Sequence, residues 1–469
     1  MTDKRSLSHS FLSAVQKVVG AENLKASQGE LIAHSRDFWL LPQAWFVKGK
    51  IPYSPSAVVY PSSTEEVVKV VKLSAKHHVP IVPYGGGSGV VGGAVPITGG
   101  LVLDMKKMNR ILEIHNENLL ARVQAGVNGW RYEEALNRLG FTGGHIPQSL
   151  PSSTVGGWVA CRAAGQFSTK YGKIEDLVVS IEAVLPNGKI VKSKTTPRSS
   201  TGPRLEQLFL GSEGVLGIIT ETTLRIFPYP EKRILLSFAF KDLQEPLDAV
   251  RKIMRRGFRP AVIRLYDEVE VGLYFRHIKG FEGKTLLLFV LEGDTNLTDL
   301  EKEIVSEECE RGIFKGEKAV HHWLENRFDV HLVSEMIKGG AIVDTIELAT
   351  TWDKATDLYR KTIEGLRALS DTVYASGHFS HFYQEGACLY LSFAGFPTSI
   401  EDYYWKAWKT VMETTLKLGG SISHHHGVGL VRAKWIRKEL GEYFELLKKI
   451  KKVIDPLSIL NPGKLGWGE

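Results

Sequence analysis

Residues 79–93 read Val79-Pro80-Ile81-Val82-Pro83-Tyr84-Gly85-Gly86-Gly87-Ser88-Gly89-Val90-Val91-Gly92-Gly93, a short strand that runs directly into a glycine-rich loop. Residues 87–92 match GxGxxG, and Asp104 follows about one strand further on. A dinucleotide-binding fingerprint of this kind needs its third glycine at the start of a helix. Residues 93–100 have no helical period and include Pro96, which argues against that fold. We predict instead an irregular loop whose backbone N–H groups can surround an anion such as a pyrophosphate.

Two further loops share this character. Residues 148–157 and 211–220 each combine small residues and hydroxyls with a flanking strand or helix. One glycine loop alone is often only a flexible turn, but three of the same kind could line one long nucleotide cofactor. The P-loop pattern is not present before Gly283-Lys284-Thr285, because Ile278 stands where its first glycine should be.

A run of three histidines occurs near the end of the chain, in His424-His425-His426-Gly427-Val428-Gly429. Each neutral imidazole carries one hydrogen-bond donor and one acceptor, and leaving either unpaired in the interior costs about 1–3 kcal/mol. The glycines allow close approach of the backbone. The pattern predicts a loop pressed against a ligand, with rings that exchange protons near neutral pH.

Composition places the chain among soluble globular proteins of two or more domains. It has 469 residues and a net charge of +7, and no apolar run reaches the ~18–20 residues of a membrane span. Three separated cysteines, without CxxC, fit a reducing cytoplasm. The basic cluster at residues 448–452 would suit an anionic membrane surface or a phosphorylated substrate. Nucleic-acid binding is not expected, and a homodimer is left open.

The order of predicted elements suggests four parts. They are a helical N-terminal segment (1–52), a first domain (53–230), a second domain (231–420), and a C-terminal segment (421–469) whose histidine loop packs back on the first domain. In the second domain, predicted strands at 235–240, 262–266, 285–293 and 388–393 alternate with helices at 297–309 and 403–418. This order predicts an α+β fold with an antiparallel sheet that carries helices on one face.

The three loops together resemble the FAD-binding domain of the vanillyl-alcohol-oxidase (PCMH-type) superfamily, over about residues 53–230. Within it, the chain is similar to the alkyldihydroxyacetonephosphate (alkylglycerone-phosphate) synthases, as a prokaryotic-type member. The matching stretches are Tyr171-Gly172-Lys173-Ile174-Glu175-Asp176-Leu177-Val178-Val179, Ser200-Thr201-Gly202-Pro203, Ile263-Arg264-Leu265, Gly386-Ala387-Cys388-Leu389-Tyr390 and the three histidines. The resemblance implies a two-subdomain FAD-binding domain, an antiparallel-sheet cap domain and a C-terminal helical segment.

Carried over residue by residue, the resemblance implies non-covalent FAD, because no histidine stands in the first loop where covalent relatives attach their flavin. Its binding residues would be Pro83, Tyr84, Gly85, Gly86, Gly87, Ser88 and Gly89; Gln148, Ser149, Leu150, Pro151, Ser152, Ser153 and Thr154; Cys161, Arg162, Ala163 and Ala164; and Glu213, Gly214, Val215, Leu216, Gly217, Ile218 and Ile219.

The same resemblance implies the catalytic residues and the reaction. Tyr390 falls on the family's catalytic tyrosine, Arg264 on an arginine needed for activity, and His424, His425 and His426 on its histidine cluster. These enzymes exchange the acyl chain of acyl-dihydroxyacetone phosphate for a long-chain alcohol through an adduct at flavin N5, in ether-lipid synthesis. We expect neighbouring imidazoles or a cation to lower the pKa of Tyr390 so that it can act as a base.

One alternative stays open, a flavin-dependent D-2-hydroxy-acid dehydrogenase of the glycolate or D-lactate type. His378 stands where the animal synthase has a substrate-binding arginine, and it resembles the Gly-His of those dehydrogenases. They carry a metal-binding glutamate where this chain has His425. His378 and His381 are available here, and neutral imidazoles can bind zinc, but without that carboxylate we assign no metal ligands. A lipid substrate would favour a cytoplasmic protein at the inner face of the membrane, with residues 315–338 as a gate or, alternatively, an ordinary helical insert.

Overall fold

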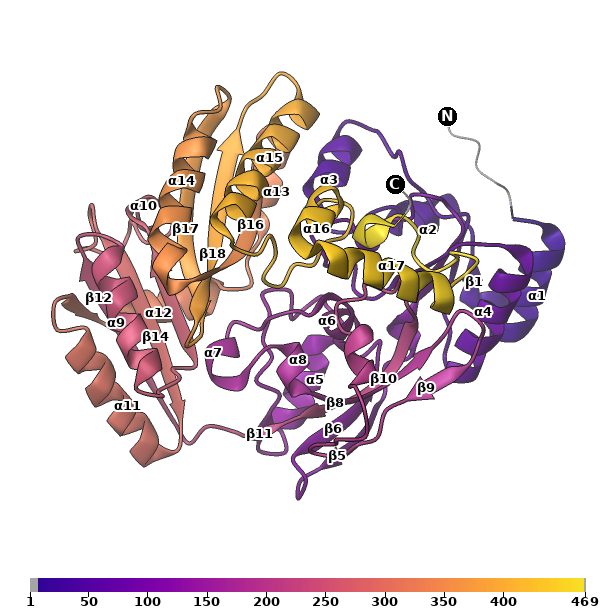
Figure 1. The fold of residues 1–469 in the computed structure, drawn as a ribbon, viewed down its shortest axis with the longest axis horizontal. Helices are drawn as coiled ribbons and strands as arrows, with labels where there is room; N and C mark the ends of the chain where they lie inside the picture. The colour runs from indigo at the N-terminus through magenta and orange to yellow at the C-terminus, as the bar shows by residue number, and fades with distance from the viewer. Residues whose placement is uncertain (1–6, 468–469) are drawn as a thin grey trace.

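The computed structural model describes residues 7–467. Figure 1 shows two halves side by side, the first built on two sheets and the second on one large sheet, with the end of the chain returning to the first half. The architecture is α+β, as the sequence predicts.

The first sheet has four strands in the order β1-β2-β4-β3. The strands are β1 (Leu24–Lys25), β2 (Ala57–Val59), β3 (Ile81–Tyr84) and β4 (Leu101–Asp104). β2, β4 and β3 run parallel, so their carboxyl ends meet at one edge. Helices α1 (His9–Val19) and α4 (Thr64–His77) pack their apolar faces on this sheet. The glycine-rich loop leaves the sheet at that edge, directly after β3.

The N-terminal segment, predicted as helical over residues 1–52, is divided into several elements within the described residues. A positive φ of 87° at Gly20 ends α1, and the chain continues as β1, then α2 (Gln28–Ala33) and α3 (Leu40–Val47). The Ser63 side chain caps α4, since its hydroxyl accepts the N–H of Glu66.

The second sheet is antiparallel, with five strands in the order β5-β6-β10-β8-β9. Its strands are β5 (Ile111–His115), β6 (Leu120–Gln124), β8 (Val178–Val184), β9 (Ile190–Lys192) and β10 (Ile218–Arg225). β8 and β9 form an antiparallel hairpin. Around the sheet lie α5 (Gly129–Asn137), α6 (Val155–Cys161), α7 (Ser168–Tyr171), α8 (Ile174–Leu177) and the short pair β7 (Phe141–Thr142) and β11 (Phe227–Pro228).

The third sheet is antiparallel, with seven strands in the order β15-β12-β14-β13-β17-β18-β16. Its strands are β12 (Lys232–Phe240), β13 (Val262–Tyr266), β14 (Thr285–Gly293), β15 (Ile313–Gly316), β16 (Ile342–Thr351), β17 (Thr372–Phe382) and β18 (Gly386–Gly395). Each side chain from Thr285 to Glu292 is buried, which explains why the sequence of β14 is a continuous apolar run and not an alternating one.

Helices cover both faces of this sheet, so the expectation of helices on one face is wrong in part. The longer helices α9 (Gln244–Arg255), α11 (Thr295–Glu308), α14 (Ala355–Arg367) and α15 (Ile400–Leu418) pack on one face (Figure 1). The shorter α10 (Glu268–Tyr274) and α12 (Lys318–Asn326) pack on the other, where Phe167 and Tyr171 of the first half also contact the sheet. This second face therefore joins the two halves.

The C-terminal segment crosses back over the first half as α16 (Ala433–Leu440) and α17 (Glu442–Ile454) (Figure 1). Beyond them, Asn461 N–H donates to the Ile81 carbonyl and the Lys464 ammonium donates to the Val95 carbonyl. The basic cluster is not wholly a surface feature, because Lys451 is buried and bonded to Asp455. Among the described helices, none is long and apolar enough to cross a membrane.

Candidate active site

A cavity of about 520 Å³ lies where the three small-residue loops meet the histidine loop. It is enclosed by residues of all three predicted loops, by α6, and by Tyr390, His425 and His426 from the second half and the C-terminal segment. The volume falls within the roughly 300–1,000 Å³ range of small-molecule sites. One site is therefore built from segments that are far apart in the sequence.

The first two loops touch through backbone that only glycine permits. A Cβ added at Gly86 would lie 1.9 Å from the Ser152 carbonyl oxygen, and one added at Gly85 would lie 2.4 Å from the Thr154 hydroxyl oxygen. Thr154 in turn caps α6 through the N–H of Gly157. This close approach leaves exposed backbone along the cavity wall, which suits the pyrophosphate and ribityl chain of a dinucleotide.

Most of the predicted cofactor residues line this cavity, and four do not. Leu150, Val215 and Leu216 are buried in the core beneath their loops, where they support the loops. Arg162 takes a left-handed conformation at the end of α6, with its guanidinium 3.7 Å from Glu175. The remaining predicted positions of all four stretches are at the cavity wall.

Glu213 fastens the third loop to the histidine loop. Its carboxylate accepts the N–H groups of Val428 and Gly429 at 2.6 and 2.8 Å. Burial raises the pKa of Glu213 to about 7, although both N–H groups act in the opposite direction. Asn461 adds a bond from its side-chain amide to the Glu213 carbonyl, at 2.6 Å.

The register of the large sheet aligns the catalytic candidates in one row. Tyr390 on β18 pairs with Glu347 of β16 on one side and with His378 of β17 on the other, and His378 pairs with Tyr266 of β13. Paired residues of neighbouring strands point to the same face. The His378 ring stacks on the Tyr390 ring at 4.9 Å with an angle of 8°.

Glu347 shapes the histidine loop from within the sheet. This fully buried carboxylate accepts the backbone N–H groups of His424, His425 and His426, the latter two at 3.3 and 2.8 Å. It also binds the guanidinium of buried Arg432 at 3.0 Å. Burial by itself would raise the pKa of Glu347, but Arg432, the imidazoles and the N–H groups outweigh it and lower the pKa.

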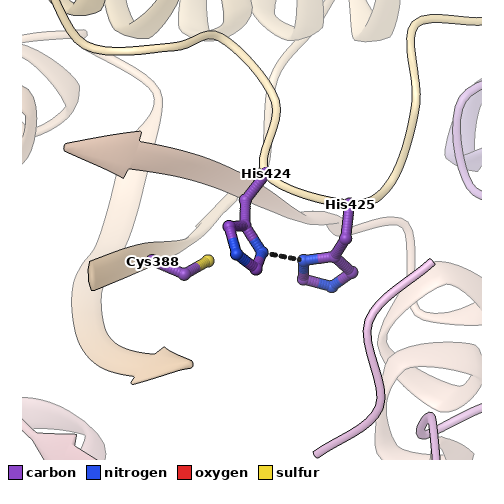
Figure 2. A group of neighbouring side chains, drawn as sticks. All are labelled: Cys388, His424 and His425. Atoms are coloured by element: carbon purple, nitrogen blue, oxygen red, sulfur yellow. Dashed lines mark hydrogen bonds between the residues drawn. The ribbon is translucent and has the colours of Figure 1, made fainter. Parts of the chain in front are cut away.

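The imidazoles converge on Tyr390. Its hydroxyl lies 2.7 Å from His425 Nε2 and 3.0 Å from His426 Nε2. Figure 2 shows the bond between the Nδ1 atoms of His424 and His425, at 2.8 Å, with the Cys388 thiol directed at His424. Nitrogen and sulfur atoms of these three residues lie within 4.8 Å of one another, close enough to share a soft metal ion if the His424–His425 bond opened.

The protonation states differ from the sequence-based expectation. Burial raises the pKa of Tyr390 well above its usual range, and the lowering effects of Arg264 and Arg432 do not offset it. The expectation of a lowered pKa is therefore wrong. Burial also lowers the pKa of His424 to about 3 and that of His426 to about 4. The resting cluster consists of a neutral phenol among neutral imidazoles.

Arg264 and His378 flank Tyr390 and do not line the cavity. The Arg264 guanidinium donates to the Tyr266 hydroxyl at 2.9 Å and lies 5.2 Å from the Trp323 ring centre. His378 Nδ1 donates to the buried carboxylate of Glu270 at 2.8 Å, which leaves Nε2 directed at Arg264. The arrangement offers a fixed cation and an oriented imidazole beside the phenol.

Several residues of the site are missed by sequence reasoning. Asp37 and Phe38 reach the cavity from the N-terminal segment, and Phe328 and Val330 from the link between α12 and α13 (His331–Lys338). Glu270 and Glu347 are buried among polar partners. A carboxylate within a largely apolar strand such as β16 is the signal that could have found Glu347.

Comparisons with known proteins agree with this geometry. Residues 55–194 match a family model described as FAD binding domain, and residues 229–465 match one described as FAD linked oxidases, C-terminal domain. The chain is 33% identical to an uncharacterized FAD-linked oxidoreductase, YgcU, of Escherichia coli (strain K12), over 97% of this chain and 98% of that protein.

Two other kinds of protein are similar. Alkyldihydroxyacetonephosphate synthase of Caenorhabditis elegans is 33% identical over 89% of this chain and 77% of its own. A solved alkyldihydroxyacetonephosphate synthase superposes with a TM-score of 0.85 and 26% identity, over 98% of this chain and 87% of that one. Mitochondrial D-lactate dehydrogenase [cytochrome] of Arabidopsis thaliana is 30% identical over 96% of this chain and 79% of its own.

Replacing Gly86 tests the cofactor cradle. Gly86→Ala places a methyl group against the Ser152 carbonyl, so we expect the affinity for FAD to fall at least about tenfold, or ~1.4 kcal/mol. Flavin fluorescence on titration of the apoprotein measures it. The matched control is Gly272→Ala, on an exposed helical position with open space around it. Unchanged FAD affinity in Gly86→Ala would show that the two loops do not form the cradle.

The neutral imidazoles predict a dependence of stability on pH. The folded pKa of His426, about 4, lies below the usual 6.5, so the unfolded chain binds more protons between these values. The stability contribution is complete above pH 6.5 and is lost as the pH falls. Between pH 7 and pH 5 the wild type should lose about 1–2 kcal/mol of unfolding free energy relative to His426→Gln.

Urea unfolding at both pH values measures this difference. His9→Gln, at an exposed position, serves as the control. Its unfolding free energy should change between the two pH values as much as that of the wild type. If the unfolding free energies of the wild type and His426→Gln change equally between the two pH values, folding does not lower the pKa of His426, which would contradict this prediction.

Proposed function

This chain belongs to the FAD-linked oxidases, and on that premise we propose that it is an FAD-dependent enzyme of the alkyldihydroxyacetonephosphate synthase type. It would exchange the acyl chain of acyl-dihydroxyacetone phosphate for a long-chain alcohol. The observation that carries the proposal is the cluster of imidazoles around Tyr390, which contains no carboxylate at the cavity-facing positions His425 and His426.

The contents of the cluster separate the two candidate chemistries. Dehydrogenases of the D-2-hydroxy-acid type are expected to carry glutamate at the position of His425. Here both cavity-facing members of the loop are imidazoles bonded to one phenol. Glu347 bonds to the loop from the sheet, but its oxygens are engaged by backbone N–H groups, the Ser423 hydroxyl and Arg432. The oxygens of Glu213 are likewise engaged by the N–H groups of Val428 and Gly429.

The residues of this chain can perform the proton chemistry of the exchange. The substrate must lose a proton from C1, beside its ketone, and Tyr390 is the phenol that lines the cavity at this point. Because Tyr390 is neutral at rest, it must pass its own proton to an imidazole, His425 or His426, before it can accept another. Bound FAD would supply an electron-accepting ring for this exchange.

The substrate would be bound by a cation at its phosphate and by an apolar surface along its alkyl chain. Arg264 lies outside the cavity wall, beside Tyr390, where Tyr266 and Trp323 hold its planar guanidinium. A phosphate that extends past Tyr390 would meet this cation. His378 is a weaker partner than an arginine, because burial lowers its pKa although Glu270 acts against this. Phe328 and Val330, within the segment predicted as a gate, give the cavity an apolar wall for an alkyl chain. Membrane contact by that segment remains a prediction.

One observation favours the alternative, oxidation of a D-2-hydroxy acid. The Glu270–His378 pair, with its 2.8 Å bond, resembles the carboxylate–imidazole pairs that remove a hydroxyl proton in catalysis. Arg264 lies 3.4 Å from His378 Nε2 and could bind the substrate carboxylate. The similarity to a D-lactate dehydrogenase is consistent with this chemistry.

Anaerobic mixing with each substrate in turn decides between these reactions. With acyl-dihydroxyacetone phosphate and a labelled long-chain alcohol, we expect fatty acid release and alcohol incorporation without lasting reduction of the flavin. Tyr390→Phe should slow the exchange by at least about 100-fold, the usual minimum effect of removing an acid–base group. Complete bleaching by D-lactate or glycolate, with no exchange, would contradict the synthase proposal.

A further inference from the structure

A second tyrosine is joined to the site by an unbroken series of hydrogen bonds. From the Tyr390 hydroxyl the series runs to His425 Nε2 at 2.7 Å, and from His425 Nδ1 to His424 Nδ1 at 2.8 Å. His424 Nε2 then lies 2.9 Å from the Tyr383 hydroxyl. Figure 2 shows the central link between the two imidazoles. Tyr383 follows β17 and is not part of the cavity wall, so substrate binding alone does not explain its position.

The series continues beyond Tyr383 into the interface between the two halves. The Tyr383 hydroxyl interacts with the Ser168 hydroxyl, which lies 2.7 Å from His381 Nδ1. Ser168 and His381 are both buried. Ser168 belongs to α7 of the first half and His381 to β17 of the second. The far end is therefore anchored in packed structure and not in solvent.

The link between two Nδ1 atoms gives the series a direction. Burial lowers the pKa of His381, His424 and His425, and nearby positive charges lower it further, so each ring is neutral and carries one N–H. If His424 holds its proton on Nε2, its Nδ1 must accept from His425, and His425 Nε2 must accept from Tyr390. If His424 holds its proton on Nδ1, every bond reverses and Tyr390 donates to His426 instead.

We propose that Tyr383 and His424 are positioning residues that fix this direction, so that Tyr390 delivers its proton to His425 and becomes the base that accepts a proton from the substrate. Tyr383 does so by accepting the Nε2–H of His424. The assignment rests on the proposed function for its chemical purpose, but the direction of the bonds is a property of the protein itself.

Residues of the cluster and the substrate account for every proton that moves. Tyr390 passes its proton to His425 Nε2 while the Nδ1 proton of His425 moves to His424 Nδ1, and Tyr390 then takes the substrate proton. The electron pair of the broken C–H bond stays with the substrate. His424, which retains its Nε2–H, becomes the cation, with the Glu347 carboxylate bonded to its backbone N–H.

The groups around His424 determine how well it can hold this charge. Glu347 favours the cation, whereas Lys173, which donates to the His424 carbonyl at 2.6 Å, and His426 disfavour it. The Cys388 thiol and the rings of His381 and Tyr383 complete the surroundings. Of these groups only Glu347 is an anion, so the positive charge on His424 is short-lived. It is lost when the proton moves back.

Neutron diffraction from deuterated, FAD-loaded crystals tests the direction without any substrate. We expect deuterium on His425 Nδ1 and on His424 Nε2, with the Tyr390 deuterium directed at His425. Deuterium on His425 Nε2, with Tyr390 directed at His426, would overturn the proposal. So would a metal ion between Cys388, His424 and His425, because it would occupy the nitrogens that form the link. Since no reaction is involved, this result stands whether or not the synthase proposal is correct.

Tyr383→Phe tests the consequence for catalysis. The variant keeps the ring but removes the acceptor for His424, so the rate of the exchange step should fall about tenfold, below the full effect of an acid–base group, with KM unchanged. Tyr403→Phe is the matched control, since it removes the hydroxyl of a buried tyrosine bonded to Thr372, outside the site, and it should retain the wild-type rate. A wild-type rate in Tyr383→Phe, or a loss seen only in KM, would refute the positioning role. If the wild type performs no exchange, the synthase proposal fails, and the neutron result still decides the direction.

Discussion

A buried carboxylate, Glu347, is the constraint on which the active site depends. It lies inside a seven-stranded sheet, fully enclosed, where an ionised group is costly unless it is paired. Its partners are Arg432 and successive N–H groups of the histidine loop. The loop must therefore run directly over this point of the sheet. Since Tyr390 is the strand neighbour of Glu347, the same contact that satisfies the carboxylate brings the imidazoles to the phenol.

A second carboxylate holds the same loop from the other half of the molecule. Glu213 accepts the N–H groups of Val428 and Gly429, two residues after the stretch that Glu347 binds. The loop is thus suspended between one acid of the cofactor half and one of the large sheet. This segment of six residues therefore fixes the position of Tyr390 on the sheet relative to the glycine loops, against which FAD would bind. A loop without these two partners would have unsatisfied backbone groups at the cavity.

The sequence predicts the parts of this arrangement better than their assembly. Apolar runs and glycine signals are local, so most strands of the first two sheets, four of the seven strands of the large sheet and most cofactor-lining positions follow from them. The strands β15, β16 and β17 are not predicted. The roles of Glu347 and Glu270 do not follow from such local signals. Glu347 and Tyr390, 43 positions apart, become neighbours only through the pairing of β16 with β18, and Glu270 meets His378 only because α10 packs against β17. The pKa of Tyr390 is misjudged for a related reason. Sequence shows the cations near it, but not the depth of burial that outweighs them.

The most direct test of this account is a double-mutant cycle on the Glu347–Arg432 pair, measured by urea unfolding of the FAD-loaded protein. Glu347→Gln and Arg432→Met should each lower the unfolding free energy by about 3–5 kcal/mol, because each leaves a buried charge unpaired. The double variant should lose at least ~1 kcal/mol less than the sum of the two. Additive losses, within about 0.5 kcal/mol, would show that the two residues act independently and would contradict the claim that their pair holds the histidine loop in place.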